Sequence, residues 1–132
     1  MLESISVSTS SRSEIISITS QVQKIVSKSK VKNGICIIYN PHTTSAITIN
    51  ENADPSVKSD ILKELNEIVP ENHGYSHMEG NADSHIKASL MGSDRVVIIK
   101  DGKLLLGTWQ GIFFCEFDGP RTRKVYIQVI SE

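Results

Sequence analysis

The sequence predicts an α+β fold: a single compact domain over residues 1–132 with mixed, mostly antiparallel β-sheets and about three helices. A chain of 132 residues has the length of one domain and can bury a sufficient core without disulfides. Apolar, β-branched stretches of strand length are frequent and make up most of the chain after residue 92. Strands and helices do not alternate strictly, which argues against a doubly wound α/β fold.

Apolar periodicity and turn residues place the individual elements. Ile5 and Val7 alternate with serines, which indicates a strand with one buried face. Ile15–Ile18 is a β-branched cluster that fits either a strand or the first turn of a helix. The segment 35–39 is apolar on both faces, as is typical of a central strand. The other strands are expected at 46–50, 95–100, 104–106, 112–117 and 125–130, and the helices at 19–29, 55–69 and 81–91.

The last two helices have recognisable boundaries. Asp54 followed by Pro55 is a cap followed by a proline at the first helical position. The face of this helix that we expect to turn inward carries Val57, Ile61, Leu65 and Ile68. In the next helix Asn81 is the predicted N-cap, Asp83 suits the helix dipole, and Gly92 is the stop.

The helix at 81–91 should present two different stripes to its surroundings. A spacing of four residues places Asn81, His85 and Ser89 on one polar stripe. The stripe expected to face the core consists of Ala82, Ile86 and Leu90. His85 would then lie where a buried surface meets a polar one, which is a suitable place for the floor of a cleft.

Composition limits the partners of this chain. Its 14 basic and 15 acidic residues give a net charge of −1, which argues against nucleic acid or an anionic membrane as the main partner. No apolar run is long enough to cross a bilayer, and the N-terminus does not resemble a signal peptide. Cys36 and Cys115 each lie in an apolar run without a nearby partner. We therefore expect two buried, reduced thiols in a cytoplasmic protein.

Three histidines at element boundaries are candidates for chemistry. His42 follows a strand, His77 comes from a glycine-containing loop, and His85 lies on a helix. Imidazole nitrogens bind divalent cations, so these three predict a zinc or magnesium site that leaves a position open for water or substrate. His77 and His85 are also candidate acid/base groups. The alternative is that His85 is a hydrogen-bonded core residue and His77 an ordinary loop residue.

Other polar residues at element boundaries complete the candidate site. Glu51 is predicted to end a strand beside Thr43 and Thr44 and to act as a general base. Arg121, in a turn after Gly-Pro, can offer a bidentate fork to phosphate or carboxylate, or it is an ordinary surface arginine. The remaining residues predicted to contact substrate are Thr43, Thr44, Asn81, Trp109 and Gln110, although a lone tryptophan also fits a core or a subunit interface.

These residues resemble the YjbQ family, also known as an uncharacterised protein family and as secondary thiamine-phosphate synthase. The resemblance covers nearly the whole chain. It rests on Pro41-His42-Thr43-Thr44, Asn50-Glu51 with Asp54, His77 with Asn81-Ala82-Asp83 and His85, Gly102-x-Leu104-x-Leu106-Gly107-Thr108-Trp109-Gln110, and Glu116-x-Asp118-Gly119-Pro120-Arg121-x-Arg123. It implies a homotrimer of α+β subunits with a polar site between subunits.

The same resemblance implies a weak thiamine-phosphate synthase activity, which joins hydroxymethylpyrimidine diphosphate to thiazole phosphate with loss of pyrophosphate. The expected ligand is thus a phosphorylated small molecule, and no organic cofactor is expected. Arg121, Arg123 and a bound divalent metal would stabilise the phosphates. Two alternatives stay open. One is a small-molecule or metal-binding trimer without catalysis, and the other is a metal-assisted hydrolase of a phosphorylated metabolite with Glu51 as base.

Overall fold

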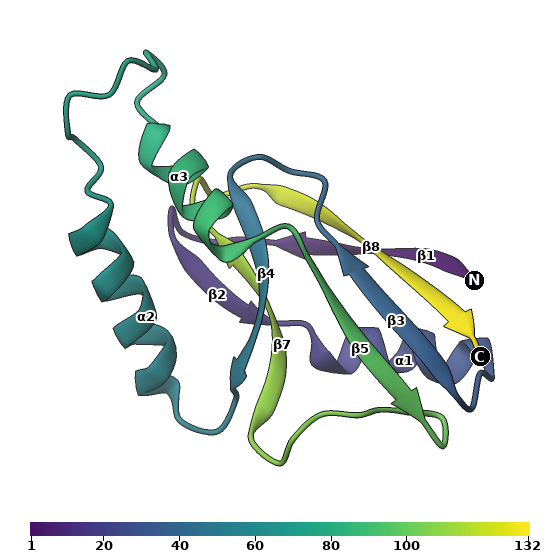
Figure 1. Cartoon of the computed structure of the whole chain (residues 1–132). Helices are drawn as coiled ribbons and strands as arrows, with labels where there is room; N and C mark the ends of the chain where they lie inside the picture. The colour runs from purple at the N-terminus through teal and green to yellow at the C-terminus, as the bar shows by residue number, and fades with distance from the viewer.

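Two antiparallel sheets form the frame of the computed structural model, which describes residues 1–132 (Figure 1). The larger sheet has five strands in the order β1-β8-β3-β5-β6, and the smaller has three in the order β2-β7-β4. The strands are β1 (Leu2–Ser8), β2 (Glu14–Ser17), β3 (Gly34–Tyr39), β4 (Ser45–Glu51), β5 (Asp94–Lys100), β6 (Lys103–Leu104), β7 (Gln110–Glu116) and β8 (Thr122–Ser131). The helices are α1 (Thr19–Ser29), α2 (Pro55–Ile68) and α3 (Ala82–Met91). The predicted α+β class is confirmed.

The smaller sheet is buried on both faces, and this determines where the cores lie. One face, with Ile47, Ile112 and Phe114, packs with α1 and the inner face of the larger sheet in a core of 15 residues. The other face, with Phe113 and Cys115, contributes to a core of seven residues that includes Leu65 of α2 and Ala88 of α3. Helices α2 and α3 therefore cover one side of the three-stranded sheet, and α3 is the one that carries residues of the candidate site.

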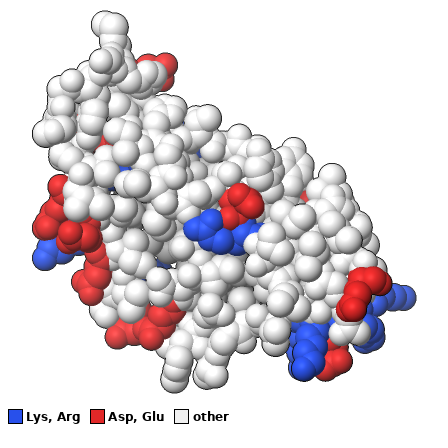
Figure 2. Space-filling view, viewed as in Figure 1, with Lys and Arg blue, Asp and Glu red and all other residues white.

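The predicted central strand is central, but it is buried on only one side. β3 pairs with β8 on one edge and β5 on the other, and Cys36 and Ile38 lie in the core. Its other face contributes Ile35, which lies between Ile98 and Ile130 of the neighbouring strands. No helix or strand covers this outer face, and all three isoleucines are exposed. Figure 2 shows few charged side chains over β3 and β5.

Helix α2 begins where the sequence predicts and buries less than predicted. The Asp54 side chain caps it by accepting a hydrogen bond of 2.9 Å from the Ser56 amide. Leu65 is its only buried residue, whereas Ile68 is 60% exposed. The predicted burial of Ile68 was wrong because α2 lies against the edge of the core at one side of the molecule and contacts it along a narrow stripe (Figure 1).

Helix α3 turns a different face to the core from the one predicted. Ala82 is buried as expected, but Ile86 is 38% exposed and Leu90 60% exposed. The buried positions are instead occupied by Asp83, Ser84, Lys87 and Ala88. The prediction failed because the buried side of α3 is stabilised by polar partners from distant parts of the chain, so apolar periodicity does not identify it.

Both cysteines are buried and free, as predicted. Burial raises the pKa of Cys36 to about 11 and that of Cys115 to about 12, so neither thiol forms a thiolate near neutral pH. No helix has the length and apolar character needed to cross a membrane.

Candidate functional site

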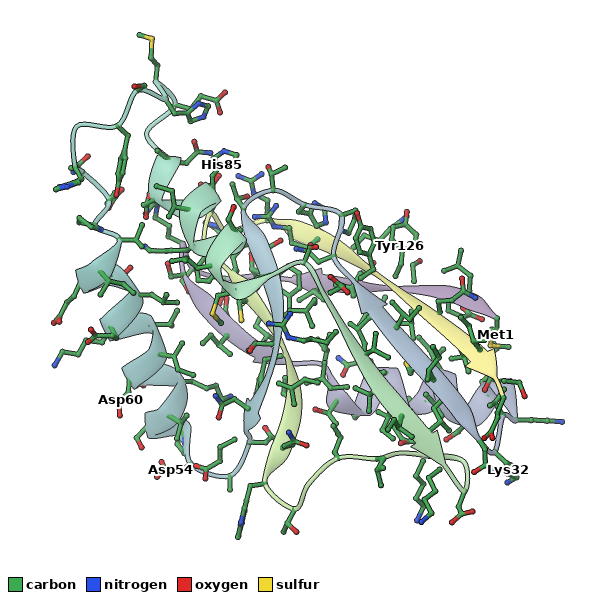
Figure 3. The ribbon with its side chains drawn as sticks, viewed as in Figure 1. Met1, Lys32, Asp54, Asp60, His85 and Tyr126 are labelled. Carbon is green, nitrogen blue, oxygen red and sulfur yellow. The ribbon has the colours of Figure 1, made fainter.

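Most of the polar side chains singled out in the sequence meet at one end of the molecule. The end of β3, the start of β4, the turn between β7 and β8, and the N-terminus of α3 lie together there (Figure 1). Figure 3 shows His85 at this end and Asp54 and Lys32 at the opposite one. A surface hollow of about 510 Å³ lies between these segments and has no hydrophobic lining residue. This histidine–arginine pocket is lined by His42, His77, His85, Arg121 and Arg123, together with Pro41, Thr43, Thr44, Glu79, Asn81 and Asp118.

His42 is held by the backbone of the neighbouring strand. Its Nε2 accepts a hydrogen bond of 3.0 Å from the Lys124 amide and lies 3.1 Å from the Lys124 carbonyl oxygen. Nδ1 is therefore the ring nitrogen that has no protein partner. Burial lowers the pKa of His42, and the positive charge of Arg123 lowers it further. His42 is thus a neutral imidazole near pH 7, with one nitrogen available to a ligand.

His77 and His85 lie side by side, as the sequence predicts. Their ring centroids are 5.2 Å apart and the rings meet edge to face at 82°. His85 is half-buried on α3, and His77 reaches it from the loop that precedes the helix. The Nε2 of His77 lies 3.9 Å from a carboxylate oxygen of Glu79 on the same loop. This pair supplies two imidazoles at one wall of the pocket.

Arg121 is oriented by a chain of polar contacts that ends on α3. Its Nε donates to the Asp118 carbonyl oxygen (2.9 Å), and its Nη2 donates to Asp118 Oδ2 (3.2 Å). The same Oδ2 accepts from Asn81 Nδ2 at 2.9 Å. Two atoms of these linked side chains have no protein partner: Nη1 of Arg121 and the buried Oδ1 of Asn81. The guanidinium is therefore fixed in direction while one of its nitrogens stays available.

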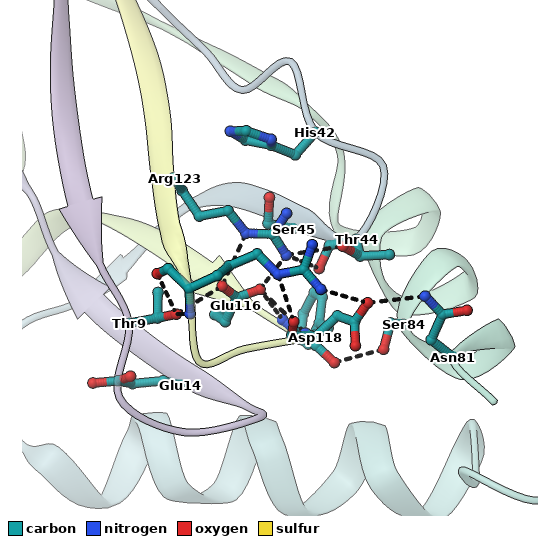
Figure 4. A network of polar contacts seen from close by, with 12 residues as sticks. Thr9, Glu14, His42, Thr44, Ser45, Asn81, Ser84, Glu116, Asp118 and Arg123 are labelled. Carbon is teal, nitrogen blue, oxygen red and sulfur yellow. Dashed lines mark hydrogen bonds and ion pairs between the residues drawn. The ribbon is translucent and has the colours of Figure 1, made fainter. Parts of the chain in front are cut away.

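Beneath the pocket floor, Glu116 organises a buried network (Figure 4). Its carboxylate accepts hydrogen bonds from Thr9 Oγ1 (2.9 Å), from the amides of Phe117 and Asp118 (3.1 Å each), and from Arg123. Burial raises the pKa of Glu116, but these hydrogen bonds outweigh it and hold the pKa below its ordinary value. Thr9 Oγ1 also accepts from the Arg121 amide at 2.9 Å. Glu116 thus fixes the turn that presents Arg121.

Arg123 lines the pocket. From the sequence it was expected only to stabilise the phosphates of a ligand. Its guanidinium is buried, donating through Nε and Nη2 to Glu116 and through Nη2 to Thr44 Oγ1 at 2.8 Å. Its Nη1 has no protein partner. The predicted contact residue Thr44 is buried and serves chiefly to hold Arg123, whereas Thr43 is exposed at the pocket wall. The motif Glu116-x-Asp118-Gly119-Pro120-Arg121-x-Arg123 is the sequence signal for this pair.

A second polar cluster, formed by Arg12, Asn66, Asp83 and Lys87, lies on the buried side of α3. Asp83 and Lys87 form an ion pair of 2.9 Å with both side chains almost fully buried. Arg12 donates to both carboxylate oxygens of Asp83, and Lys87 donates to Asn66 of α2 at 2.7 Å. Burial raises the pKa of Asp83, but hydrogen bonds from Arg12 and Lys87 outweigh burial and hold it below its ordinary value. This Asp83–Lys87 cluster fastens α3 to α2 and to the loop after β1.

Comparison with known proteins identifies the chain. The profile of one protein family, described as UPF0047 protein YjbQ-like, matches residues 3–132. The chain belongs to the YjbQ family. It is 55% identical over 132 residues to a UPF0047 protein of Methanocaldococcus jannaschii, an alignment that covers 100% of this chain and 96% of the relative. It is 49% identical to the UPF0047 protein YugU of Bacillus subtilis, with 99% of this chain and 100% of the relative covered.

Solved structures of YjbQ relatives share the fold described above. An uncharacterised conserved protein of the YjbQ family from Clostridium acetobutylicum superimposes with a TM-score of 0.96 at 53% identity, covering 97% of this chain and 99% of the relative. A protein of unknown function from Sulfolobus solfataricus gives a TM-score of 0.96 at 39% identity, covering 100% and 97%.

Three of the predicted site residues lie away from the pocket in this YjbQ-family chain. Glu51 ends β4, the strand that begins beside Thr44, and so lies about 20 Å from the pocket at 3.3 Å per residue. Gln110 pairs with Glu51, and Trp109 is exposed next to it. The prediction that Glu51 lies beside Thr43 and Thr44 was wrong, because these residues lie at opposite ends of β4. Glu51, Trp109 and Gln110 form a separate polar end of the three-stranded sheet and do not reach the histidines of the same chain.

The predicted three-histidine metal site is not formed by this arrangement. No group of three or more histidine, cysteine, aspartate or glutamate side chains is positioned to hold a metal ion. The Nε2 atom of His42 is bound to the Lys124 backbone, and His77 and His85 face each other edge to face. Zinc or magnesium binding by His42, His77 and His85 stays a prediction.

Proposed function

We propose that the histidine–arginine pocket binds the phosphate groups of a phosphorylated small molecule. The observation that supports this most strongly is the pair Arg121 and Arg123, each fixed by carboxylate partners and each with Nη1 free of protein hydrogen bonds. Guanidinium groups oriented in this way suit phosphate oxygens, because they remain charged at all relevant pH values and lose little side-chain freedom on binding.

The surroundings of the two arginines support the same ligand. The N-terminus of α3 lies at the pocket, where unpaired helix amides favour an anion. His42 is neutral and has a free ring nitrogen that can hydrogen-bond to a phosphate oxygen. Asn81 Oδ1 is a buried acceptor without a protein partner, which suits a hydroxyl or N–H group elsewhere on the ligand.

We further propose that the weak thiamine-phosphate synthase reaction implied by the family takes place in this pocket. In that reaction the C–O bond to pyrophosphate breaks, the leaving group keeps the electron pair, and the thiazole nitrogen forms the new C–N bond. Arg121 and Arg123 are suited to stabilise the leaving pyrophosphate. His77 and His85 are suited to exchange a proton with it, which is the role proposed for them here in place of metal binding.

A steady-state assay of pyrophosphate release from hydroxymethylpyrimidine diphosphate and thiazole phosphate tests this proposal. Arg121→Lys keeps the charge and loses the fork, so KM should rise by about tenfold with a smaller effect on kcat. The matched control is Lys100→Arg on exposed β5, which should leave both constants unchanged. Absence of turnover by the wild-type protein, combined with normal phosphate binding, would reduce the function to ligand binding.

We also propose that the chain assembles as the homotrimer implied by the family, through the outer face of the larger sheet. Ile35, Ile98 and Ile130 form an adjacent, exposed apolar row on that face, and such uncovered patches mark protein interfaces. Ile98→Glu should yield a monomer by light scattering. Met78→Glu is the control, because Met78 is 97% exposed on the loop outside this patch. A wild-type monomer at micromolar concentration would contradict the trimer.

A further inference from the structure

A second hollow, also of about 510 Å³, adjoins the histidine–arginine pocket. The two hollows share His42, Thr43 and His85 in their linings. The remaining wall of the second comes from the start of β4, the second half of α3 and the turn into β5. The two histidines therefore lie at the boundary between two adjoining spaces.

The two hollows differ sharply in charge. The first contains two arginines and the carboxylates of Asp118 and Glu79. The second contains no aspartate, glutamate, lysine or arginine, and besides the shared residues it is lined by small side chains: Ser45, Ala88, Ser89, Gly92 and Ser93. We call it the serine hollow. A charged group has no partner there, whereas a neutral polar group meets several hydroxyls.

The serine hollow has a rigid wall because Asn40, itself buried, ties its two sides together. The Asn40 amide donates to the Ser93 carbonyl oxygen at 2.8 Å, and its side chain accepts from Ser45 Oγ at 3.0 Å. The same Asn40 Oδ1 accepts from the His42 amide at 3.3 Å. The loop that carries His42 and the turn that carries Ser93 are thus fixed to each other without any ligand.

Several hydroxyls in the serine hollow remain available to a ligand. Ser89 donates to the His85 carbonyl oxygen at 2.9 Å and keeps its lone pairs as acceptors. Thr43 and Ser93 are exposed, and their hydroxyls make no hydrogen bond within the protein. Such a set of neutral donors and acceptors is typical of sites that orient the uncharged part of a ligand.

We propose that the serine hollow is the subsite for the neutral, hydroxyl- or ring-nitrogen-bearing part of the substrate whose phosphate occupies the histidine–arginine pocket. This inference rests on the proposed phosphate site. It identifies the substrate class as a phosphate ester of a small polar alcohol. It also places the bond between phosphate and organic group at the shared wall, beside His42 and His85, where an acid/base group acts on the bridging oxygen.

Isothermal titration with inorganic phosphate, ribose 5-phosphate and phenyl phosphate tests the inference. Wild-type protein should bind ribose 5-phosphate about tenfold more tightly than inorganic phosphate, since neutral hydrogen bonds of this kind contribute on that scale. Phenyl phosphate should bind no more tightly than inorganic phosphate. Ser89→Phe fills the serine hollow and should abolish the preference for ribose 5-phosphate while leaving the affinity for inorganic phosphate within twofold of the wild-type value.

Leu90→Phe is the matched control, because this neighbouring residue on α3 is exposed and lines neither hollow. It should behave as wild type toward all three ligands. Equal affinities of wild-type protein for phosphate and ribose 5-phosphate, or an unchanged preference in Ser89→Phe, would overturn the serine hollow and leave the phosphate site intact. If the wild-type protein binds none of the three ligands, both the phosphate site and the inference fall.

Discussion

Two polar clusters lie on opposite sides of α3 and each contains an arginine–aspartate pair, yet only one is available to a ligand. In the Asp83–Lys87 cluster each charge finds a partner within the protein, because Asp83 accepts from Arg12 and Lys87, and Lys87 also donates to Asn66. In the histidine–arginine pocket Arg121 keeps a free nitrogen beside a surface hollow. The first cluster is closed and the second is open.

The comparison shows how polar residues with structural roles differ from those suited to binding. A buried ion pair holds elements together only when its hydrogen bonds are complete, because any unpaired buried charge is costly. A binding site needs the reverse, with side chains oriented by some partners while other atoms remain free. Arg123 combines both states, since Glu116 and Thr44 hold two of its nitrogens and the third is free.

The largest effect is expected from opening the closed cluster. Lys87→Ala leaves Asp83 buried with only Arg12 as a charged partner, so the free energy of unfolding should fall by about 3 kcal/mol. Urea denaturation measures this loss, and Lys63→Ala, exposed on α2, should change stability by less than about 0.5 kcal/mol. Phosphate affinity of the folded Lys87→Ala protein should stay within twofold of wild type. A loss below about 1 kcal/mol would show that the cluster does not hold α3.

The next largest effect concerns turnover. His85→Ala should lower kcat for pyrophosphate release by about 100-fold, the usual scale for losing an acid/base group, while the melting temperature falls only slightly. Ile86→Ala beside it should change neither by much, because Ile86 is partly exposed and outside both cores. Should His85→Ala unfold as readily as Lys87→Ala and still turn over normally, His85 belongs to the structural side of α3.

Acid should destabilise both clusters through their carboxylates. The pKa values of Asp83 and Glu116 are lowered in the folded protein from ordinary values of 3.8 and 4.5. Their contribution to stability is therefore complete above those ordinary values and is lost as pH falls through the lowered folded pKa values. Urea midpoints should fall slightly below about pH 6.5, because the pKa of His42 is lowered from its ordinary value of 6.5 in the folded protein, and should fall steeply only below about pH 4.5. Glu116→Gln should show a shallower decline, and a steep loss already at pH 6 would contradict the assignment.

The sequence predicted those features that depend on local pattern. Element types and the Asp54 cap follow from apolar spacing, capping residues and turn residues. The buried side of α3 could not be predicted in this way, because the groups that stabilise Asp83 and Lys87 come from Arg12 and Asn66. Partners that lie far apart in the sequence leave no periodic signal.

The composition of the pocket was predicted only in part, for reasons that lie in strand geometry. Thr44 immediately precedes β4 and Glu51 ends it, so the two lie at opposite ends of the strand, which a polar motif alone does not reveal. Residues of β8 alternate between outward- and inward-facing positions. Arg123 occupies an inward-facing position and is therefore buried at the pocket floor. The serine hollow has no motif, because serines spread over a helix and two turns become neighbours only after folding.

Titration calorimetry with inorganic phosphate at low ionic strength tests most directly whether Arg121 binds a phosphate in the open pocket. Wild-type protein should bind phosphate, and Arg121→Ala should lower the affinity by about tenfold or more through loss of a charge-assisted contact. Because the Arg121 side chain is 49% exposed, the melting temperature of the Arg121→Ala protein should differ little from that of the wild type. Equal phosphate affinity in wild type and Arg121→Ala would contradict the account.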